Sequence, residues 1–366
     1  MIDRIRKALA SGLLPGIYYS IARMVWWFSF RLSQSDENLP KVTVVVPVYN
    51  VEQYLADCLR SLRAQNYKNF EIIAVNDGAT DGSAAILQQF AATTKNLKIV
   101  TQHNQGLGAA RNAGVSAIQD TDYLMFVDSD DLLPLGAISR YVKQATKSGS
   151  QLLVGKTVCF YGMRFFPRTS TAKFFRQNLT ASTLNQHPEF LGDATSWNKL
   201  YDFKFWQQHK FSFPTGVWYE DMTLVCTAYL AAGTFDVLKA PSYFWRVRAE
   251  GESLSKRTKE LKAIQDRLLS IEQIDKILRR AIEKGIIEKS VHDSYLTRVI
   301  SMDLQLFVGA IPETDEAYFE EFKARASAVL AQADESVWAN ATGAKRAAVW
   351  VAVNGTREQT IQQLAG

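Results

Sequence analysis

The sequence contains few cysteines and lacks the signatures of several protein classes. Its three cysteines, Cys58, Cys159 and Cys226, lie far apart and in no metal-ligand spacing. This pattern argues against a disulfide or zinc framework and favours a reducing compartment. No uncharged apolar run reaches the roughly 18–20 residues that a membrane-spanning helix needs. With 47% hydrophobic and 22% charged residues, the composition is that of an ordinary globular protein.

Acidic residues are nearly absent from residues 1–34. The segment holds Asp3 against five basic residues, Arg4, Arg6, Lys7, Arg23 and Arg31. It therefore carries four of the five net positive charges of the chain, and the rest is almost neutral. A nucleic-acid partner is not expected, because such proteins carry a basic stripe on the folded body.

The same segment has the composition of an interfacial helix. After Pro15-Gly16, apolar residues recur at helical spacing, and tryptophans and tyrosines broaden the stripe. Basic flanks with clustered aromatic residues are typical of helices in the headgroup region of anionic membranes. The alternative is a helix packed on the protein's own surface or on a partner. We expect residues 1–38 to be a membrane-associating segment and linker, and the protein to be cytoplasmic and peripheral on the cytosolic face of the membrane.

From residue 41 the sequence alternates between strand and helix patterns. Runs rich in β-branched and apolar residues predict strands at 41–49, 70–77, 97–102 and 123–128. Apolar residues at helical spacing predict helices at 51–65, 83–93, 109–119 and 135–148. This alternation is typical of an α/β fold with a largely parallel sheet, whose ligands bind at the carboxyl ends of the strands. Past residue 256 the chain is predicted to be helical.

The fourth predicted strand ends in an acidic cluster, Asp128-Ser129-Asp130-Asp131. Carboxylates at positions i and i+2 repel each other unless a cation lies between them or the chain turns sharply. Oxygen-only ligands select hard ions such as Mg²⁺ or Mn²⁺, which commonly bridge to substrate phosphates. The alternative is an acidic helix cap, because Asp131 precedes residues that are predicted to be helical.

Three further motifs follow the earlier strands in order. They are Pro47-Val48-Tyr49-Asn50-x-Glu52, Asn76-Asp77-Gly78-x-x-Asp81-Gly82-Ser83 and Asn104-x-Gly106-x-x-x-Ala110-Arg111. Together with the acidic cluster they resemble, in order and spacing, the family 2 glycosyltransferases with the GT-A nucleotide-sugar fold. The resemblance is close over residues 41–150. It continues more loosely to about residue 255, through Trp197-Asn198-Lys199, Glu220-Asp221 and Arg248-x-x-Gly251-x-Ser253.

The resemblance implies a domain organisation and an activity. Residues 39–255 would form the GT-A catalytic domain, a Rossmann-like, mostly parallel sheet flanked by helices, and residues 256–366 a helical carboxy-terminal region. The enzyme would be a metal-dependent inverting hexosyl- or N-acetylhexosaminyltransferase. It would move a sugar from a UDP-sugar to a hydroxyl of a glycan, most similarly to enzymes that build or decorate teichoic acids or exopolysaccharides. A polyol-phosphate polymer is therefore one expected acceptor.

Two alternatives to this activity remain open. A nucleotidyltransferase of related fold should carry a glycine-rich loop with arginine and lysine after the first strand, where this chain has Pro47-Val48-Tyr49-Asn50. A catalytically inactive nucleotide-sugar-binding module would usually have lost the acidic cluster or the catalytic base.

The resemblance also implies roles for single residues. Pro47 and Tyr49 would flank the uracil ring, Asp77 would accept its N–H, and Glu52 would contact the ribose. Asp128 and Asp130 would hold Mn²⁺ or Mg²⁺ against the diphosphate. The other implied donor-binding residues are Val48, Asn104, Gly108, Arg111, Ser129, Arg248 and Ser253, with Arg246 as the alternative to Arg248.

The implied acceptor side lies further along the chain. Asp221 would be the general base that deprotonates the acceptor hydroxyl, and Glu220, Trp197 and Lys199 would bind the acceptor. Each role has a structural alternative. Glu220-Asp221 would also suit the start of a helix, and Trp197 would also suit the core.

Overall fold

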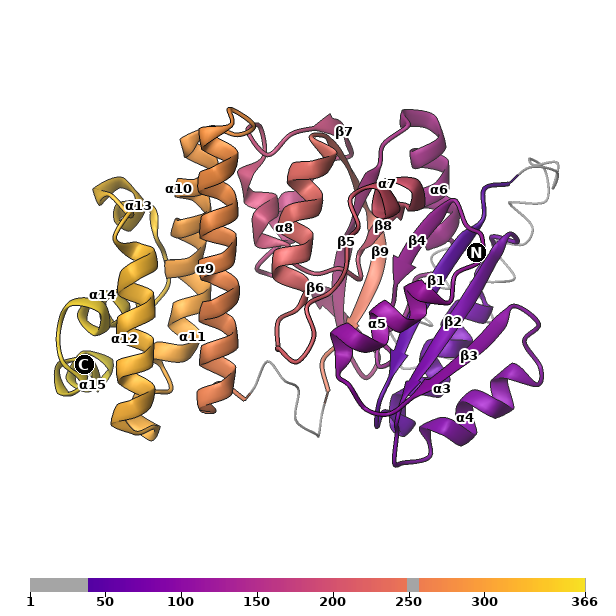
Figure 1. Cartoon of the computed structure of the whole chain (residues 1–366), viewed down its shortest axis with the longest axis horizontal. Coiled ribbons are helices and arrows are strands. Elements are labelled where there is room, and N and C mark those ends of the chain that lie inside the picture. The colour runs from indigo at the N-terminus through magenta and orange to yellow at the C-terminus, as the bar shows by residue number, and fades with distance from the viewer. Residues whose placement is uncertain (1–38, 249–256, 366) are drawn as a thin grey trace. The chain divides into compact units, whose positions relative to one another are not determined.

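The computed structural model describes residues 39–248 and 257–365, which form two compact units (Figure 1). The described part of the first unit comprises residues 39–181, 196–215 and 234–248. The second unit comprises residues 182–195, 216–233 and 257–365. The segment 39–255, predicted as one catalytic domain, therefore contributes to both units. The predictions for residues 1–34 lie outside the described residues.

The first unit is built on one sheet, in which the described residues supply nine strands in the order β3-β2-β1-β4-β8-β5-β9-β7, with β6 paired to β5. The strands are β1 (Val42–Val48), β2 (Phe70–Asp77), β3 (Leu97–Gln102), β4 (Tyr123–Phe126), β5 (Leu152–Tyr161), β6 (Arg164–Pro167), β7 (Leu179–Ser182), β8 (Lys199–Asp202) and β9 (Phe235–Arg246). Strands β3, β2, β1 and β4 are parallel, as are β5 and β9. Strand β8 is antiparallel to β4 and β5, and β6 is antiparallel to β5. The predicted α/β fold with a mostly parallel sheet is confirmed.

Five α-helices and one 3₁₀ helix of the described residues belong to this unit, and the first three connect the parallel strands β1 to β4. They are α3 (Glu52–Arg63), α4 (Ser83–Ala91), α5 (Leu107–Ser116), α6 (Ala137–Ser148) and α7 (Phe203–Gln208), with the 3₁₀ helix η1 (Ala172–Phe175). Every residue of β1 is buried, as expected for a central parallel strand that is covered on both faces. Helix α5 lies close to the sheet at Gly114, where an added Cβ would come within 2.3 Å of Val45 Cγ1.

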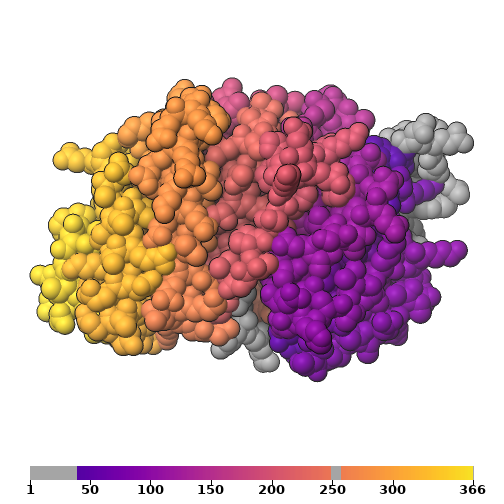
Figure 2. Space-filling model, in the orientation of Figure 1, coloured from indigo at the N-terminus to yellow at the C-terminus, as the bar shows by residue number. Residues whose placement is uncertain are grey.

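The second unit is helical. It contains η2 (Pro188–Gly192), α8 (Asp221–Ala232), α9 (Leu261–Glu283), α10 (Lys289–Arg298), the π-helical turn η4 (Val299–Asp303), α11 (Leu304–Val308), η5 (Ile311–Glu313), α12 (Glu316–Leu330), α13 (Glu335–Asn340), α14 (Arg346–Asn354) and α15 (Arg357–Ala365). Helix α12 packs on α9 and α14, and side chains fill the gaps between these ribbons (orange and yellow in Figure 2). The predicted helical carboxy-terminal region is confirmed. None of the helices in the described residues is long and apolar enough to cross a membrane.

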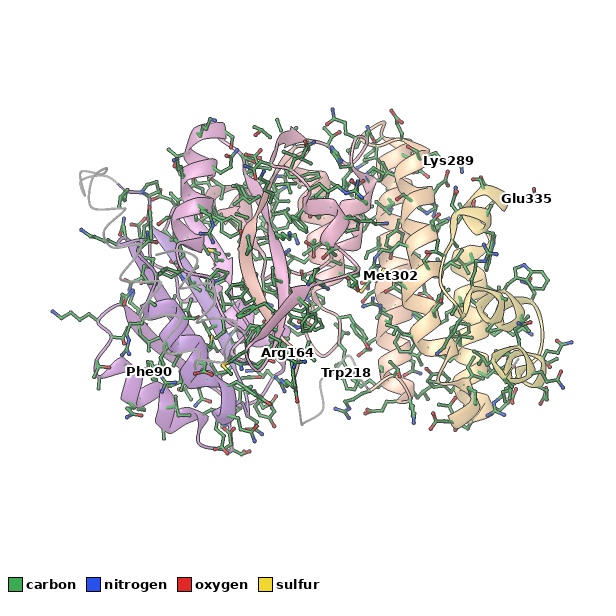
Figure 3. The ribbon with its side chains drawn as sticks, turned by 180° about the vertical axis from the view of Figure 1, so that it is seen from behind. Phe90, Arg164, Trp218, Lys289, Met302 and Glu335 are labelled. Carbon is green, nitrogen blue, oxygen red and sulfur yellow. The ribbon has the colours of Figure 1, made fainter. Side chains whose placement is uncertain are left out.

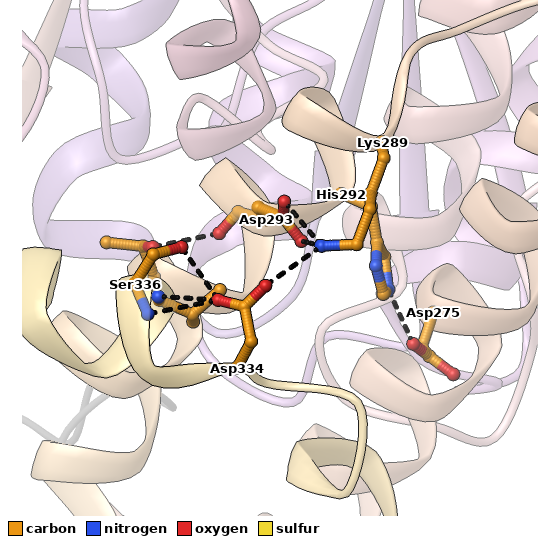
Figure 4. A network of polar contacts seen from close by, with 8 residues as sticks. Asp275, Lys289, His292, Asp293, Asp334 and Ser336 are labelled. Carbon is orange, nitrogen blue, oxygen red and sulfur yellow. Dashed lines mark hydrogen bonds and ion pairs between the residues drawn. The ribbon is translucent and has the colours of Figure 1, made fainter.

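Polar contacts join α10 to its neighbours (Figure 4). The buried His292 shares a hydrogen bond of 2.7 Å between its Nε2 and Asp275 Oδ1, which links α10 to α9. Lys289, labelled at the start of α10 in Figure 3, reaches Asp334 Oδ2 at 3.2 Å. Asp334 is the N-cap of α13 and accepts the backbone N–H of Ser336 and Val337. Hydrogen bonds from Ser336 and Lys289 lower the pKa of Asp334 to about 2.

Candidate active site

Parallel pairing brings the loops after β1, β2 and β4 to one edge of the sheet. Val48 at the end of β1 pairs with Asn76 of β2, and Phe126 at the end of β4 pairs alongside β1. The loops after β1 and β2 are also tied directly, because Asn50 Oδ1 accepts the backbone N–H of Thr80 at 2.8 Å. The motifs predicted at these strand ends therefore lie together.

The loop after β1 presents one accessible ring. Pro47 and Val48 are buried, whereas the side chain of Tyr49 is 46% exposed. Glu52, the first residue of α3, accepts the backbone N–H of Gly82 through its Oε2 at 2.6 Å. Tyr49 is thus available as a platform for a flat base, and Glu52 connects α3 to the start of α4.

Asp77 organises the turn between β3 and α5. Its buried carboxylate accepts the Gln102 side-chain amide at 2.7 Å and the backbone N–H groups of Gln105 and Gly106, each at 3.0 Å. The backbone N–H of Gly106, whose φ is +86°, also donates to Asn104 Oδ1 at 3.2 Å. Each carboxylate oxygen has two lone pairs, so these three hydrogen bonds leave Asp77 able to accept one more. Its predicted contact with a uracil N–H stays a prediction.

Helix α5 carries the next two predicted residues. Gly108 lies so close to the neighbouring loop that an added Cβ would come within 2.3 Å of the Pro214 carbonyl oxygen. Arg111 is buried, with its guanidinium 5.1 Å from the centre of the Phe213 ring. Its NH2 group donates to Asp128 Oδ1 at 2.8 Å. Arg111 is therefore aimed at the acidic cluster rather than at solvent.

The second carboxylate of the predicted metal pair also faces an arginine. Arg248 donates through Nε and NH2 to Asp130 Oδ2, each at 2.7 Å. The Arg248 guanidinium lies 5.3 Å from the centre of the Tyr54 ring, a contact that the sequence did not predict. Side chains of Asp128 and Asp130 stay 24% and 18% exposed, whereas Ser129 is buried. The two carboxylates are thus accessible and charge-balanced.

The third acid of the cluster has a different environment. Asp131 is buried, accepts the Tyr243 hydroxyl at 2.8 Å and accepts the backbone N–H of Arg246 at 2.7 Å. Burial raises its pKa well above the usual value, and the nearby Asp130 and Asp128 add to the rise. It caps no helix, because the N-cap of α6 is Gly136. The helix-cap alternative for Asp131 is therefore wrong, and Tyr243 is a contributor that the sequence did not single out.

The donor set suits a hard divalent cation. Asp128 and Asp130 offer two carboxylates, while the described residues contain no group of three or more His, Cys, Asp or Glu side chains that could hold a metal ion. Mg²⁺ and similar ions are commonly bound by one or two carboxylates together with substrate phosphates and water. Asp128 and Asp130 are the residues that would hold such an ion.

The predicted acceptor residues of the first unit are buried. Trp197 is only 5% exposed and stacks on Tyr243 with 4.2 Å between ring centres. Lys199 is fully buried, and its Nζ donates to Asn198 Oδ1 at 2.9 Å. The Arg168 guanidinium lies 5.4 Å from the Trp197 ring. Both residues contribute to the interior here, and their role toward an acceptor stays a prediction.

The predicted base belongs to the second unit. Asp221 is the first residue of α8 and is partly exposed, while the preceding Glu220 is buried at the N-cap position and makes no side-chain capping bond. Tyr219, immediately before this pair, has a positive φ of 63°, which is rare for a bulky residue and concentrates at functional sites. Ser253 lies outside the described residues.

Comparisons with known proteins agree with this arrangement. Residues 43–209 match the family model for glycosyl transferase family 2. The glycosyltransferase GlyA of Streptococcus pneumoniae is 33% identical over 216 residues, which cover 57% of this chain and 31% of that protein. The poly(ribitol-phosphate) β-glucosyltransferase of Bacillus spizizenii is 31% identical over 221 residues, which cover 59% of this chain and 33% of that protein. The chain thus spans about a third of the length of these relatives.

A solved structure shows the same fold. S. aureus TarS 1–349 in complex with UDP-GlcNAc aligns with a TM-score of 0.66 and 22% identity, covering 88% of this chain and 89% of that one. Residues 1–255 are too few to make up 88% of this chain. The likeness therefore extends into the helices beyond residue 256. Residues 43–209 therefore belong to glycosyl transferase family 2, and the predicted family and GT-A fold are confirmed.

Proposed function

We propose that the chain is an inverting glycosyltransferase that uses a UDP-sugar and Mn²⁺ or Mg²⁺. The observation that carries this proposal is the set of groups gathered at one sheet edge: an exposed ring, a buried carboxylate and two accessible carboxylates that each face an arginine. These groups are Tyr49, Asp77, Asp128 with Arg111, and Asp130 with Arg248. Together they offer a surface for a base, an acceptor for its N–H, and charges for a diphosphate.

The arginines give this edge its electrostatic balance. Arg111 and Arg248 each pair with one carboxylate of the cluster, so they place positive charge beside the carboxylates that a metal-bound diphosphate would approach. A divalent cation held by Asp128 and Asp130 would neutralise charge on the leaving diphosphate. Preorganised charges of this kind stabilise the charge that develops on a leaving group. Crystal structures of the TarS fold with UDP and with UDP-GlcNAc support a UDP-sugar as donor.

Asp221 completes the proposed chemistry. Its carboxylate would take the proton of the acceptor hydroxyl while that oxygen attacks the anomeric carbon from the side opposite UDP. The new C–O bond forms as the bond to the UDP oxygen breaks, so the configuration inverts and UDP departs. A positioned general base contributes about 10²–10⁴-fold to such a rate.

The acceptor is proposed to be a hydroxyl of a cell-wall polymer, an exopolysaccharide or another glycan. Support comes from the relatives, one of which is named a poly(ribitol-phosphate) β-glucosyltransferase. A polyol-phosphate chain has the free hydroxyl groups that the proposed reaction requires. The transferred sugar would be a hexose or an N-acetylhexosamine.

Donor hydrolysis tests this proposal directly. The full chain would be incubated with UDP-glucose, UDP-galactose, UDP-GlcNAc and UDP-GalNAc in the presence of Mn²⁺, and UDP release would be measured. We expect release from one of these donors, and we expect EDTA or Asp130→Ala to abolish it and weaken UDP binding in calorimetry. Asp120→Ala, which removes an exposed acid of the same unit, should change neither. Full turnover in EDTA would contradict the metal requirement.

A further inference from the structure

The predicted base follows a short segment that α9 holds in place. This segment, residues 216–219, directly precedes Glu220 and Asp221 and lies in the same unit as α9. The backbone N–H of Trp218, labelled in Figure 3, donates to Asp266 Oδ2 at 2.9 Å. Lys262 Nζ donates both to the carbonyl oxygen of Gly216 at 3.1 Å and to Asp266 Oδ2 at 2.8 Å. One turn of α9 thus fixes two backbone groups of the segment.

A second contact acts on the last residue of the segment. The Arg267 guanidinium lies 4.7 Å from the centre of the Tyr219 ring. Arg267 is itself anchored by the buried Asp303 of η4, which also accepts Arg298 NH1 at 2.5 Å. This chain of contacts ties Tyr219 through α9 to the π-helical turn at η4.

These contacts act on a backbone that is unfavourable by itself. A bulky non-glycine residue at positive φ is unfavourable by itself and persists only where its surroundings hold it. Tyr219 has a φ of 63°, and its carbonyl oxygen accepts the N–H of Met222 in the first turn of α8 at 3.2 Å. The conformation at Tyr219 therefore sets the direction in which α8, and with it Asp221, leaves the segment.

We infer that Asp266 of α9 is a positioning residue for the base Asp221, acting through the backbone of residues 216–219. The inference rests on the proposed function, in which Asp221 takes the acceptor proton. A general base must lie within hydrogen-bonding reach of its proton, and a misplacement of about 1 Å can cost about 10²-fold in rate. Through Asp266, the carboxy-terminal helices would contribute to catalysis, although Asp266 itself would touch no substrate.

Two substitutions at Asp266 and one control in the same helix test the inference in the full chain. Asp266→Ala removes the acceptor for the Trp218 N–H, whereas Asp266→Asn keeps an acceptor oxygen and loses the charge facing Lys262. The control is Glu272→Gln, because Glu272 of α9 also pairs with an arginine, Arg325 of α12, at 2.6 Å but does not touch the segment. All three remove one acidic charge of α9 from an ion pair.

The expected result is a split between rate and donor affinity. Asp266→Ala should lower kcat for transfer by about 10²-fold and Asp266→Asn by less, while UDP affinity in calorimetry stays near wild type. Glu272→Gln should lower the unfolding temperature without changing kcat. Equal kcat in Asp266→Asn, Glu272→Gln and wild type would overturn the inference, even if Asp266→Ala does not fold. So would a parallel loss of UDP affinity and kcat in Asp266→Asn.

A double substitution separates this inference from the proposed function. If Asp266 acts through Asp221, Asp266→Asn should have no further effect on kcat once Asp221→Asn is present, because interacting residues are not additive. Additive effects of the two substitutions would overturn the inference. Wild-type activity of Asp221→Asn alone would instead contradict the base assignment in the proposed function.

Discussion

Asp221 is the residue on which the proposed chemistry depends most directly. Asp221→Asn keeps the size of the side chain and removes its ability to take a proton. We expect the transfer rate to fall by about 10²-fold or more while UDP affinity in calorimetry stays near wild type, since no proposed donor contact is lost. If UDP binding disappears together with activity, Asp221 is a structural helix-start residue and the base must be sought elsewhere.

Single residues also show how far the sequence could be interpreted without the structure. Asp77, Asp128 and Asp130 could be located because each lies at the end of a strand or within a few residues of it, and strand ends of a parallel sheet collect at one edge. The partners of the neighbouring Asp131 could not, because Tyr243 and Arg246 lie more than 110 residues further along the chain. A sequence pattern reports neighbours along the chain, whereas these hydrogen bonds depend on how β9 passes the acidic cluster.

At the scale of secondary structure, the four parallel strands of the amino-terminal half of the sheet were predictable, whereas the later strands were not. The predicted strands at 70–77 and 97–102 coincide with β2 and β3, because long apolar runs between turn residues leave little ambiguity. Strands β6, β7 and β8 have four residues each. Such a length is too short for an alternating pattern to stand out. Strand β4 is equally short but could be predicted from its apolar residues, whereas β6, β7 and β8 appear only in the structure.

The start of α13 offers a test of a single helix end. The lowered pKa of Asp334 means that the fold favours its ionised form, so its contribution to stability is present above the usual pKa of 3.8 and is lost as the pH falls through about 2. We expect wild type to be more stable than Asp334→Asn in urea unfolding at neutral pH, and the difference to shrink over that acidic range. This sign follows from linkage between proton binding and folding.

A neighbouring acid provides the control for this measurement. Glu335→Gln changes the next residue of the same helix and leaves the bonds from Ser336, Val337 and Lys289 to Asp334 in place. Its difference from wild type should depend less on pH. A pH-independent difference for Asp334→Asn would show that the ion pair with Lys289 and the charged cap do not contribute to stability.

For the whole molecule, the amino-terminal segment makes a separate prediction. Five cations and one anion are concentrated in residues 1–34, and each cation near an anionic surface is worth roughly 1 kcal/mol. We propose that this segment brings the enzyme to the cytosolic face of a membrane. Full-length protein should co-sediment with anionic liposomes, more weakly at high salt, whereas a chain that starts at Pro40 should not. Neutral liposomes are the control, and absence of binding at low salt would contradict the membrane proposal.

The domain organisation shows what the sequence could not reveal at this scale. A change to helical patterns near residue 256 suggested a boundary there, because composition changes along the chain. The structure instead assigns residues 182–195 and 216–233 to the helical unit, since α8 packs on α9. The sequence of α8 does not indicate which later helix will cover its apolar residues, so this packing could not be predicted from the sequence.

This interleaving has a consequence for the order in which the protein is made. The ribosome releases the chain from its amino terminus, so α8 emerges before the helix on which it packs. The sheet is likewise incomplete until β9, which pairs along β5, has been synthesised. Neither unit can finish folding before later segments are made, because the face of α8 that packs on α9 stays uncovered until α9 has been synthesised. Nascent chains halted between these two helices should therefore expose the α8 residues that later pack on α9, and exposed apolar surface of this kind is what chaperones bind.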